Sequence, residues 1–118
     1  LHGDGVKARE GSLVVECTVY ENYGDGVVTA GASYTRDCLG YGNSLGSGVY
    51  IENSQDGRCD DNHVLDNEHG VKTEYADCLI LGNSAAGNSI DYDLDSGTLV
   101  DLETGSPNAA GPWASFDY

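Results

Sequence analysis

The sequence is poor in basic residues and in large apolar ones, and it contains no methionine. Its 118 residues include five Lys and Arg, one Trp, one Phe and two Pro. Twenty Asp and Glu outweigh the basic residues and give a formal net charge of −15. A surface of this sign cannot neutralise phosphates, so the composition argues against nucleic acid and anionic membranes as partners. It fits a solvated secreted protein, a salt-adapted protein or a cation binder.

Long hydrophobic runs are also missing. No apolar stretch approaches the length of a membrane span, and no signal peptide is visible. Because the chain begins at Leu1 and lacks methionine, we expect it to be a processed or trimmed product. Its length predicts one domain with a modest core, and its 17 Gly indicate many turns.

An internal repeat runs through most of the chain. A Gly-Val pair recurs at spacings of 21, 22 and 22 residues, and an asparagine recurs at spacings of 21, 24 and 21. The pairs begin at Gly5, Gly26, Gly48 and Gly70, and the asparagines are Asn22, Asn43, Asn67 and Asn88. Three more columns keep this register: Cys17, Cys38, Asn62 and Asn83; Val14, Thr35, Cys59 and Ile80; and Val19, Gly40, Val64 and Ala85. Such self-similarity is typical of a solenoid.

Each unit is too short for two packed helices, and the residues after each Gly-Val pair alternate as in strands. We therefore predict an all-β fold, a parallel β-solenoid of about five coils over residues 1–97. Residues 98–118 leave the repeat and are predicted to form a C-terminal tail. The valine of each pair is expected to point inward, and the residues after it outward: Lys7, Val28, Tyr50 and Lys72.

Two residue types in the repeat have a physical explanation. Glycine before each strand permits either a sharp turn with positive φ or a close approach of the backbone. Asparagine tolerates turn conformations, and its amide can bond the backbone or the amide stacked above it. We therefore interpret Asn22, Asn43, Asn67 and Asn88 as a structural turn ladder rather than as ligands.

Two segments of the repeat resemble a known group of proteins. They read Asp-Asn-His-Val-Leu-Asp-Asn-Glu-His-Gly-Val at 61–71 and Cys-Leu-Ile-Leu-Gly-Asn-Ser-Ala-Ala-Gly-Asn at 78–88. Together with the Gly-Asp-Gly-Val units, they are similar to right-handed parallel β-helix repeats of the pectate-lyase-like superfamily. Secreted bacterial β-helix repeat proteins of unassigned function are also similar at the C-terminus, through residues 91–94 and 112–118. The resemblance implies a right-handed β-helix. It implies no single function, because the superfamily includes lyases, hydrolases, epimerases, adhesins and phage fibre parts.

The resemblance also implies more coils on the N-terminal side. The chain starts directly on a repeat, with no evident cap. We expect it either to be the C-terminal part of a longer protein or to dock its open end on another subunit.

Four cysteines suit an oxidising compartment. Cys17 and Cys38 share a column in neighbouring coils, where their Cα atoms should lie within the range of a disulfide. The pair is interpreted either as a disulfide or as two stacked thiols that fill the core. There is no Cys-x-x-Cys, and the three histidines share no column, which argues against zinc.

Two sets of carboxylates are candidate sites. Asp91, Asp93 and Asp95 alternate like the start of a calcium loop, or like the polar residues of a half-buried strand. Glu52 and Glu74 are expected to stack on neighbouring coils, either as a catalytic acid pair or as a solvated face. No cofactor is predicted, apart from calcium as the candidate at the first set.

The tail contains the aromatic residues Trp113, Phe116 and Tyr118. It is interpreted as a cap on the last coil or as a segment exchanged with a neighbouring subunit. The first functional hypothesis is a non-enzymatic structural or surface protein, secreted or held at the cell surface. It would stack through its ends on copies of itself or on upstream β-helix coils, as a fibre or part of an adhesin. The alternative is a carbohydrate-binding or polysaccharide-cleaving module, with exposed tyrosines such as Tyr20, Tyr23, Tyr41 and Tyr50 against the sugar.

Overall fold

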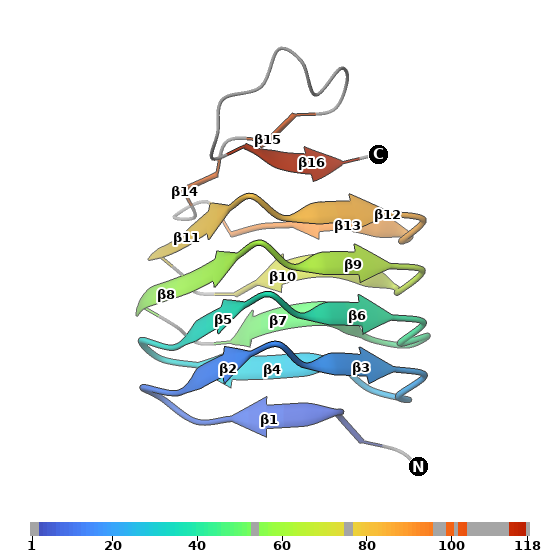
Figure 1. Ribbon diagram of the computed structural model, residues 1–118, viewed down its shortest axis with the longest axis horizontal. Coiled ribbons are helices and arrows are strands. Elements are labelled where there is room, and N and C mark those ends of the chain that lie inside the picture. The colour runs from blue at the N-terminus through green and yellow to red at the C-terminus, as the bar shows by residue number, and fades with distance from the viewer. Residues whose placement is uncertain are drawn as a thin grey trace.

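The chain folds as a stack of β-coils in which each coil contributes one strand to each of three parallel sheets (Figure 1). This computed structural model describes residues 3–52, 55–74, 77–95, 99–100, 102–103 and 114–117. Four coils are complete, and β13 and β14 begin a fifth. The prediction of an all-β parallel β-helix is confirmed. The described residues contain no helix that is long and apolar enough to cross a membrane.

Each sheet collects every third strand of the coils. Sheet A contains β1 (Val6–Ala8), β4 (Val27–Ala30), β7 (Ser47–Glu52), β10 (His69–Thr73) and β13 (Ile90–Asp93). Sheet B contains β2 (Leu13–Val15), β5 (Tyr34–Arg36), β8 (Gln55–Asp60), β11 (Asp77–Leu81) and β14 (Leu99–Val100). Sheet C contains β3 (Thr18–Tyr20), β6 (Leu39–Tyr41), β9 (His63–Leu65), β12 (Ser84–Ala86), β16 (Ser115–Asp117) and β15 (Leu102–Glu103).

The strand register matches the columns of the repeat. In sheet A, Val6, Val27, Val49 and Val71 are successive partners. In sheet B the partners are Val14, Thr35, Cys59 and Ile80. In sheet C they are Val19, Gly40, Val64 and Ala85. Equivalent positions of successive units therefore stack on one another.

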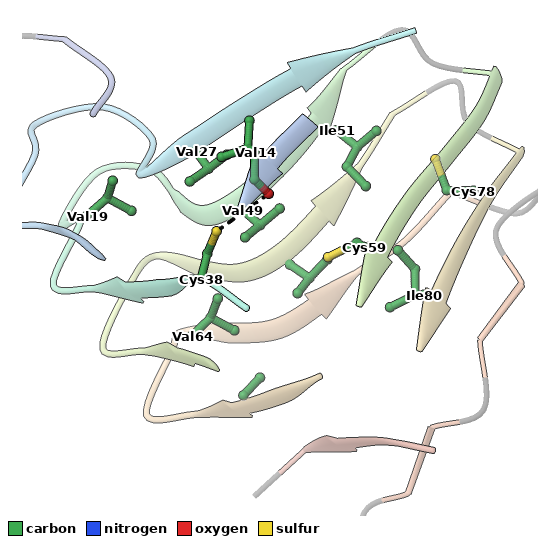
Figure 2. Packing of buried hydrophobic residues seen from close by; sticks show 12 residues of the cluster. Val14, Val19, Val27, Cys38, Val49, Ile51, Cys59, Val64, Cys78 and Ile80 are labelled. Atoms are coloured by element: carbon green, nitrogen blue, oxygen red, sulfur yellow. Dashed lines mark hydrogen bonds between the residues drawn. The ribbon is translucent and has the colours of Figure 1, made fainter. Parts of the chain in front are cut away.

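The core is a column of small and β-branched side chains enclosed by the three sheets (Figure 2). Val27, Val49, Val64 and Val71 are fully buried, as is Ile80. β-branched residues fit this interior because their stiff side chains stand perpendicular to the pleated sheet and pack on the same residue type in the next coil.

One outward position is buried. Val28 lies in the outward column of sheet A, between Lys7 and Tyr50, but it is only 2% exposed. Nζ of Lys7 reaches past this coil to Oε1 of Glu52, at 3.8 Å. The aliphatic stem of the lysine and the tyrosine on the other side therefore cover the valine.

The recurring glycine provides space rather than an unusual φ. None of Gly5, Gly26, Gly48 and Gly70 has a positive φ. A Cβ atom at Gly26 or Gly48 would lie 2.8 Å from Nδ2 of the asparagine column. The glycine column therefore leaves room for the asparagine side chains, which is the close-approach alternative of the two that the sequence allowed.

Positive φ occurs at the corners on either side of sheet C. Between sheets B and C the residues are Glu16, Asp37, Asp61 and Gly82, with φ of 54°, 54°, 52° and 62°. After sheet C they are Glu21, Gly42, Asp66 and Gly87, with φ of 52°, 65°, 53° and 70°. Acidic residues and glycine thus share two columns that need a left-handed backbone, which aspartate tolerates better than most residues.

The C-terminal segment adds strands to the stack. β14 pairs with β11, β16 pairs with β12, and β15 pairs with β16, all in parallel. β16 and β15 lie beyond β12 at the end of the stack opposite the N-terminus (Figure 1).

Candidate functional site

The asparagine column forms a ladder that has a direction. Asn22 donates from its backbone N and its Nδ2 to Oδ1 of Asn43, at 3.1 and 3.0 Å. Asn43 makes the same two bonds to Asn67, at 2.9 and 2.8 Å, and Asn67 makes them to Asn88, at 2.8 and 2.9 Å. Between asparagines, the donors therefore always belong to one coil and the acceptor Oδ1 to the next coil along the chain. Among the described residues, none donates to Oδ1 of Asn22, so the ladder presents an acceptor on its N-terminal side.

Asp91 terminates this ladder at the other end. The backbone N and Nδ2 of Asn88 donate to Oδ1 of Asp91, at 3.2 and 2.7 Å. The register of β10 with β13 places Asp91 opposite Gly70, in the glycine column. Among the described residues no further asparagine follows in the column, and the carboxylate occupies the place that the amide would take.

A second ladder runs through the corner between sheets B and C. The backbone N of Cys38 donates to Oδ1 of Asn62, at 3.0 Å, and Asn62 donates from N and Nδ2 to Oδ1 of Asn83, both at 3.0 Å. The backbone N of Asn83 donates to Oγ of Ser115, at 3.3 Å. Both ladders therefore end at the C-terminal side on acceptors from the chain itself.

Cys17 and Cys38 are the first two members of this column, and both are free thiols in the structure. The Cys38 thiol donates to the carbonyls of Arg36 and Val14, at 3.2 and 3.9 Å, and the second contact is drawn in Figure 2. The Cys17 thiol donates to the carbonyl of Val15, at 3.5 Å. Burial raises the pKa of the Cys38 thiol, which keeps it protonated.

The first coil has open strand edges. β1, β2 and β3 pair with β4, β5 and β6, and in the described part of the chain no strand pairs with their other edges. The backbone N of Val6 donates inward to the carbonyl of Gly26, at 2.8 Å. In a parallel ladder the neighbouring Lys7 then directs its backbone groups away from the stack. Val6, Ala8 and Cys17 pack against the core but stay partly exposed.

At the opposite end, two carboxyl groups meet. Asp117 of β16 is the register partner of Ala85, and its side chain is hydrogen-bonded to that of Asp91. This bond and partial burial raise the pKa of Asp117 to about 6, because two carboxylates can share a hydrogen bond only when one is protonated.

Glu52 and Glu74 lie on the outer face of sheet A, and other side chains engage both. Oε1 of Glu52 is 3.8 Å from Nζ of Lys7. The Tyr50 hydroxyl donates to Oε2 of Glu74, and Nζ of Lys72 lies 5.4 Å from the centroid of the Tyr50 ring. Burial and the bond to Glu74 raise the pKa of Tyr50. Glu52 and Glu74 thus each have a partner, Glu52 in Lys7 and Glu74 in Tyr50.

The three aspartates of the calcium candidate are not gathered around a common point. Asp91 accepts from Asn88, Oδ2 of Asp93 lies 3.4 Å from Nε2 of His69, and the backbone N of Asp95 donates to Oγ1 of Thr73 at 2.8 Å. Over the residues that the structure describes, no group of three or more His, Cys, Asp or Glu could hold a metal ion.

Of the tail aromatics, Trp113 and Tyr118 lie outside the described residues. The backbone of Phe116 belongs to β16, between β12 and β15. Sequence reasoning missed the roles of Ser115, which ends the second ladder, and of Asp117, which bonds to Asp91, because the repeat spacing is lost before them.

A cluster on sheet B was also missed. The Tyr34 hydroxyl and Nε of Arg58 both donate to Oδ2 of Asp60, at 2.8 and 2.5 Å. The Arg58 guanidinium lies 5.0 Å from the centroid of the Tyr34 ring. The hydrogen bond to Asp60 raises the pKa of Tyr34. The repeat could have predicted this pair, because Tyr34 and Arg58 each directly precede a member of the column that contains Thr35 and Cys59.

The coil stack, its three parallel sheets and its asparagine ladders define the chain as a parallel β-helix. The family described as "Right handed beta helix region" matches residues 1–109, and the chain belongs to this family. No curated protein and no solved structure matches the chain.

Proposed function

We propose that the protein is a non-enzymatic structural or surface protein that works by stacking β-helix coils end to end. It would be extracellular, as a fibre subunit or as part of a larger adhesin-like assembly. The observation that carries the proposal is the first coil, where, among the described residues, nothing pairs with the outer edges of β1, β2 and β3 or donates to Oδ1 of Asn22. Unpaired parallel edges are templates for further strands.

Two kinds of coil could occupy this end. A copy of the chain would bring the outer edges of β13, β14 and β15, which are the last strands of the three sheets. Its own ladder ends on Asp91, so such a contact would rest on strand pairing alone. Other β-helix coils with an unterminated asparagine would pair their strands and also donate to Asn22.

The outer face of sheet A supports a non-catalytic role. A glycosidase or lyase needs carboxyl groups that are placed for proton transfer to a substrate. Here Glu74 accepts from Tyr50, and Glu52 lies beside Lys7. The net charge of −15 adds support, because it would repel a polyuronate.

The test is particle length, measured by negative-stain electron microscopy and by light scattering after size exclusion. Lys7→Pro removes a backbone N–H that faces away from the stack, and Lys7→Thr is the matched control that loses the same charge. We expect the wild type and Lys7→Thr to form longer particles at moderate salt, and Lys7→Pro to stay short. Monomers of wild type at every salt and protein concentration would contradict stacking between copies.

A further inference from the structure

The outer face of sheet C differs from those of the other two sheets. Strand register places two columns on it: Thr18, Leu39, His63 and Ser84, and Tyr20, Tyr41, Leu65 and Ala86. Over β3, β6, β9 and β12, neither column contains Asp, Glu, Lys or Arg. The corresponding face of sheet A contains Lys7, Lys72 and Glu52, and that of sheet B contains Arg36 and Arg58. Sheet C thus presents an uncharged strip on a molecule of net charge −15.

Acidic residues border this strip on both sides. Glu16, Asp37 and Asp61 form the corner before sheet C, and Glu21 and Asp66 belong to the corner after it. All five are exposed, and one of them, Asp37, already has an ion-pair partner in Arg36, at 2.5 Å. We call these two columns the acidic rims. A ligand lying on the strip would therefore meet tyrosine rings in the middle and carboxylates at both edges.

On the outer faces of sheets A and B, each of two tyrosine rings is covered by a basic side chain. Tyr34 has the Arg58 guanidinium over its face and donates to Asp60. Tyr50 has the Lys72 ammonium over its face and donates to Glu74. In both cases the next coil supplies the cation and the carboxylate, and both tyrosines are only partly exposed. A cation over an aromatic face is attracted by the ring quadrupole.

Tyr20 and Tyr41 lack this cover. They are direct register partners on neighbouring coils, and they are 60% and 42% exposed. Over the described part of the chain, no basic side chain lies on either ring. The chain's five basic residues lie in strands of sheets A and B, or directly after one: Lys7, Arg9, Arg36, Arg58 and Lys72.

We propose that the outer face of sheet C binds a segment of another protein that carries lysine or arginine side chains. Its cations would lie over Tyr20 and Tyr41, and others would pair with the acidic rims. This repeats between two proteins the arrangement that Arg58 and Lys72 make within the chain. A second copy is a poor occupant of this face, because the acidic rims of the two copies would repel each other. The proposal goes beyond coil stacking, since it concerns the side of the stack and not its ends.

The backbone of sheet C narrows how the segment can bind. β3, β6, β9 and β12 are consecutive in one parallel sheet, so their backbone groups are used between coils. A partner on this face therefore meets side chains only, and strand addition is confined to the ends of the stack. Recognition would rest on charge and aromatic contact, which makes it dependent on salt.

The experiment uses an acetylated and amidated twelve-residue peptide of alternating arginine and serine, titrated into the ¹⁵N-labelled chain. A glutamine–serine peptide is the neutral control. We expect the largest amide shifts at Tyr20, Tyr41 and the acidic rims, with affinity falling as NaCl is raised. Tyr20→Leu/Tyr41→Leu leaves the net charge unchanged and should weaken binding about ten-fold. Tyr23→Leu, an exposed tyrosine outside the sheet, should bind like the wild type.

A second pair of variants tests the rims, and both variants of the pair lose the same two negative charges. Asp61→Asn/Asp66→Asn keeps the left-handed backbone, which asparagine tolerates, and Asp56→Asn/Asp77→Asn removes two exposed carboxylates elsewhere. The rim variant should weaken binding several-fold more than its control. Equal binding by the tyrosine variant, or equal loss in both aspartate variants, would show only the general attraction of an acidic protein and overturn the proposal. Tighter binding of cellohexaose than of the arginine peptide at Tyr20 and Tyr41 would also overturn it, in favour of a glycan.

Discussion

At the scale of single residues, the fold depends on pairing each glycine with an asparagine. Asn43 is fully buried, donates twice to Asn67 and accepts twice from Asn22. A Cβ atom added to Gly26 would lie only 2.8 Å from Nδ2 of Asn43, which is too close for both to fit. The polar ladder can therefore be buried because its buried groups are all bonded and because the adjacent column has no side chain.

This predicts two different costs for two glycines. In Gly48→Ala, the new Cβ would lie 2.6 Å from Cγ1 of Val64 and 2.8 Å from Nδ2 of Asn67, so we expect a loss of about 2–3 kcal/mol in the free energy of unfolding. Gly42 has a φ of 65° and no atom closer than 3.8 Å to the added Cβ, so Gly42→Ala should cost about 1 kcal/mol, from backbone conformation alone. Urea unfolding measures both. A larger loss at Gly42 than at Gly48 would contradict the space-filling explanation.

The glycine and aspartate positions also show what sequence could and could not predict. The repeat located the glycine column but allowed two reasons for it, because close approach depends on which side chain the fold brings opposite. Asp91 and Asp93 alternate as in a calcium loop, yet they lie on the extended strand β13. Side chains two apart on a strand are about 6.6 Å apart, whereas a calcium loop turns its oxygens onto one ion.

At the scale of elements, the complete coils were predictable and the C-terminal strands were not. Twelve strands, β1 to β12, follow the 21- to 24-residue repeat, so stacking fixed their register. β16 lies 32 residues after the position it bonds, Asn83, and no periodicity marks that distance. Specific side-chain hydrogen bonds hold β16 in place: Ser115 accepts from Asn83, and Asp117 bonds to Asp91.

The attachment of β16 should therefore depend on pH. The folded pKa of Asp117 is about 6, above the usual value of 3.8, so the folded state holds the proton more tightly than the unfolded state does. The contribution of this bond is complete below about pH 4 and is lost as the pH rises to about 6. Tyr92, whose pKa is raised by burial, lies near the same carboxyl and stays neutral across this range.

Hydrogen exchange of the β16 amides measures this attachment. Protection should fall between about pH 4 and 6, after correction for the intrinsic exchange rate. Asp117→Asn can donate to Asp91 at any pH and should remove most of this change, while Asp56→Asn, an exposed aspartate on β8, should keep it. Protection that increases with pH would contradict the shared proton.

At the scale of the whole molecule, the stack brings like charges together. Acidic residues recur at the same corners of successive coils, so Glu16, Asp37 and Asp61 stand about 5 Å apart along one rim. Only five basic residues oppose 20 acidic ones, and two of them form ion pairs that are open to solvent: Lys7 with Glu52, and Arg36 with Asp37 of the rim. Exposed pairs contribute little, so repulsion along the rims should dominate the electrostatic free energy.

Salt should therefore stabilise the protein. Between 20 mM and 500 mM NaCl the Debye length falls from roughly 20 Å to below 5 Å, which screens the rims, and we expect the melting temperature to rise by about 5 °C. Asp61→Asn removes one charge from a rim at a φ of 52° that asparagine accepts, so it should raise the melting temperature at low salt and reduce the salt dependence. Asp77→Asn changes the net charge equally away from the rims and should do less. A melting temperature that falls with salt would mean that the surface ion pairs outweigh the repulsion, and that stacked acidic corners cost this fold nothing.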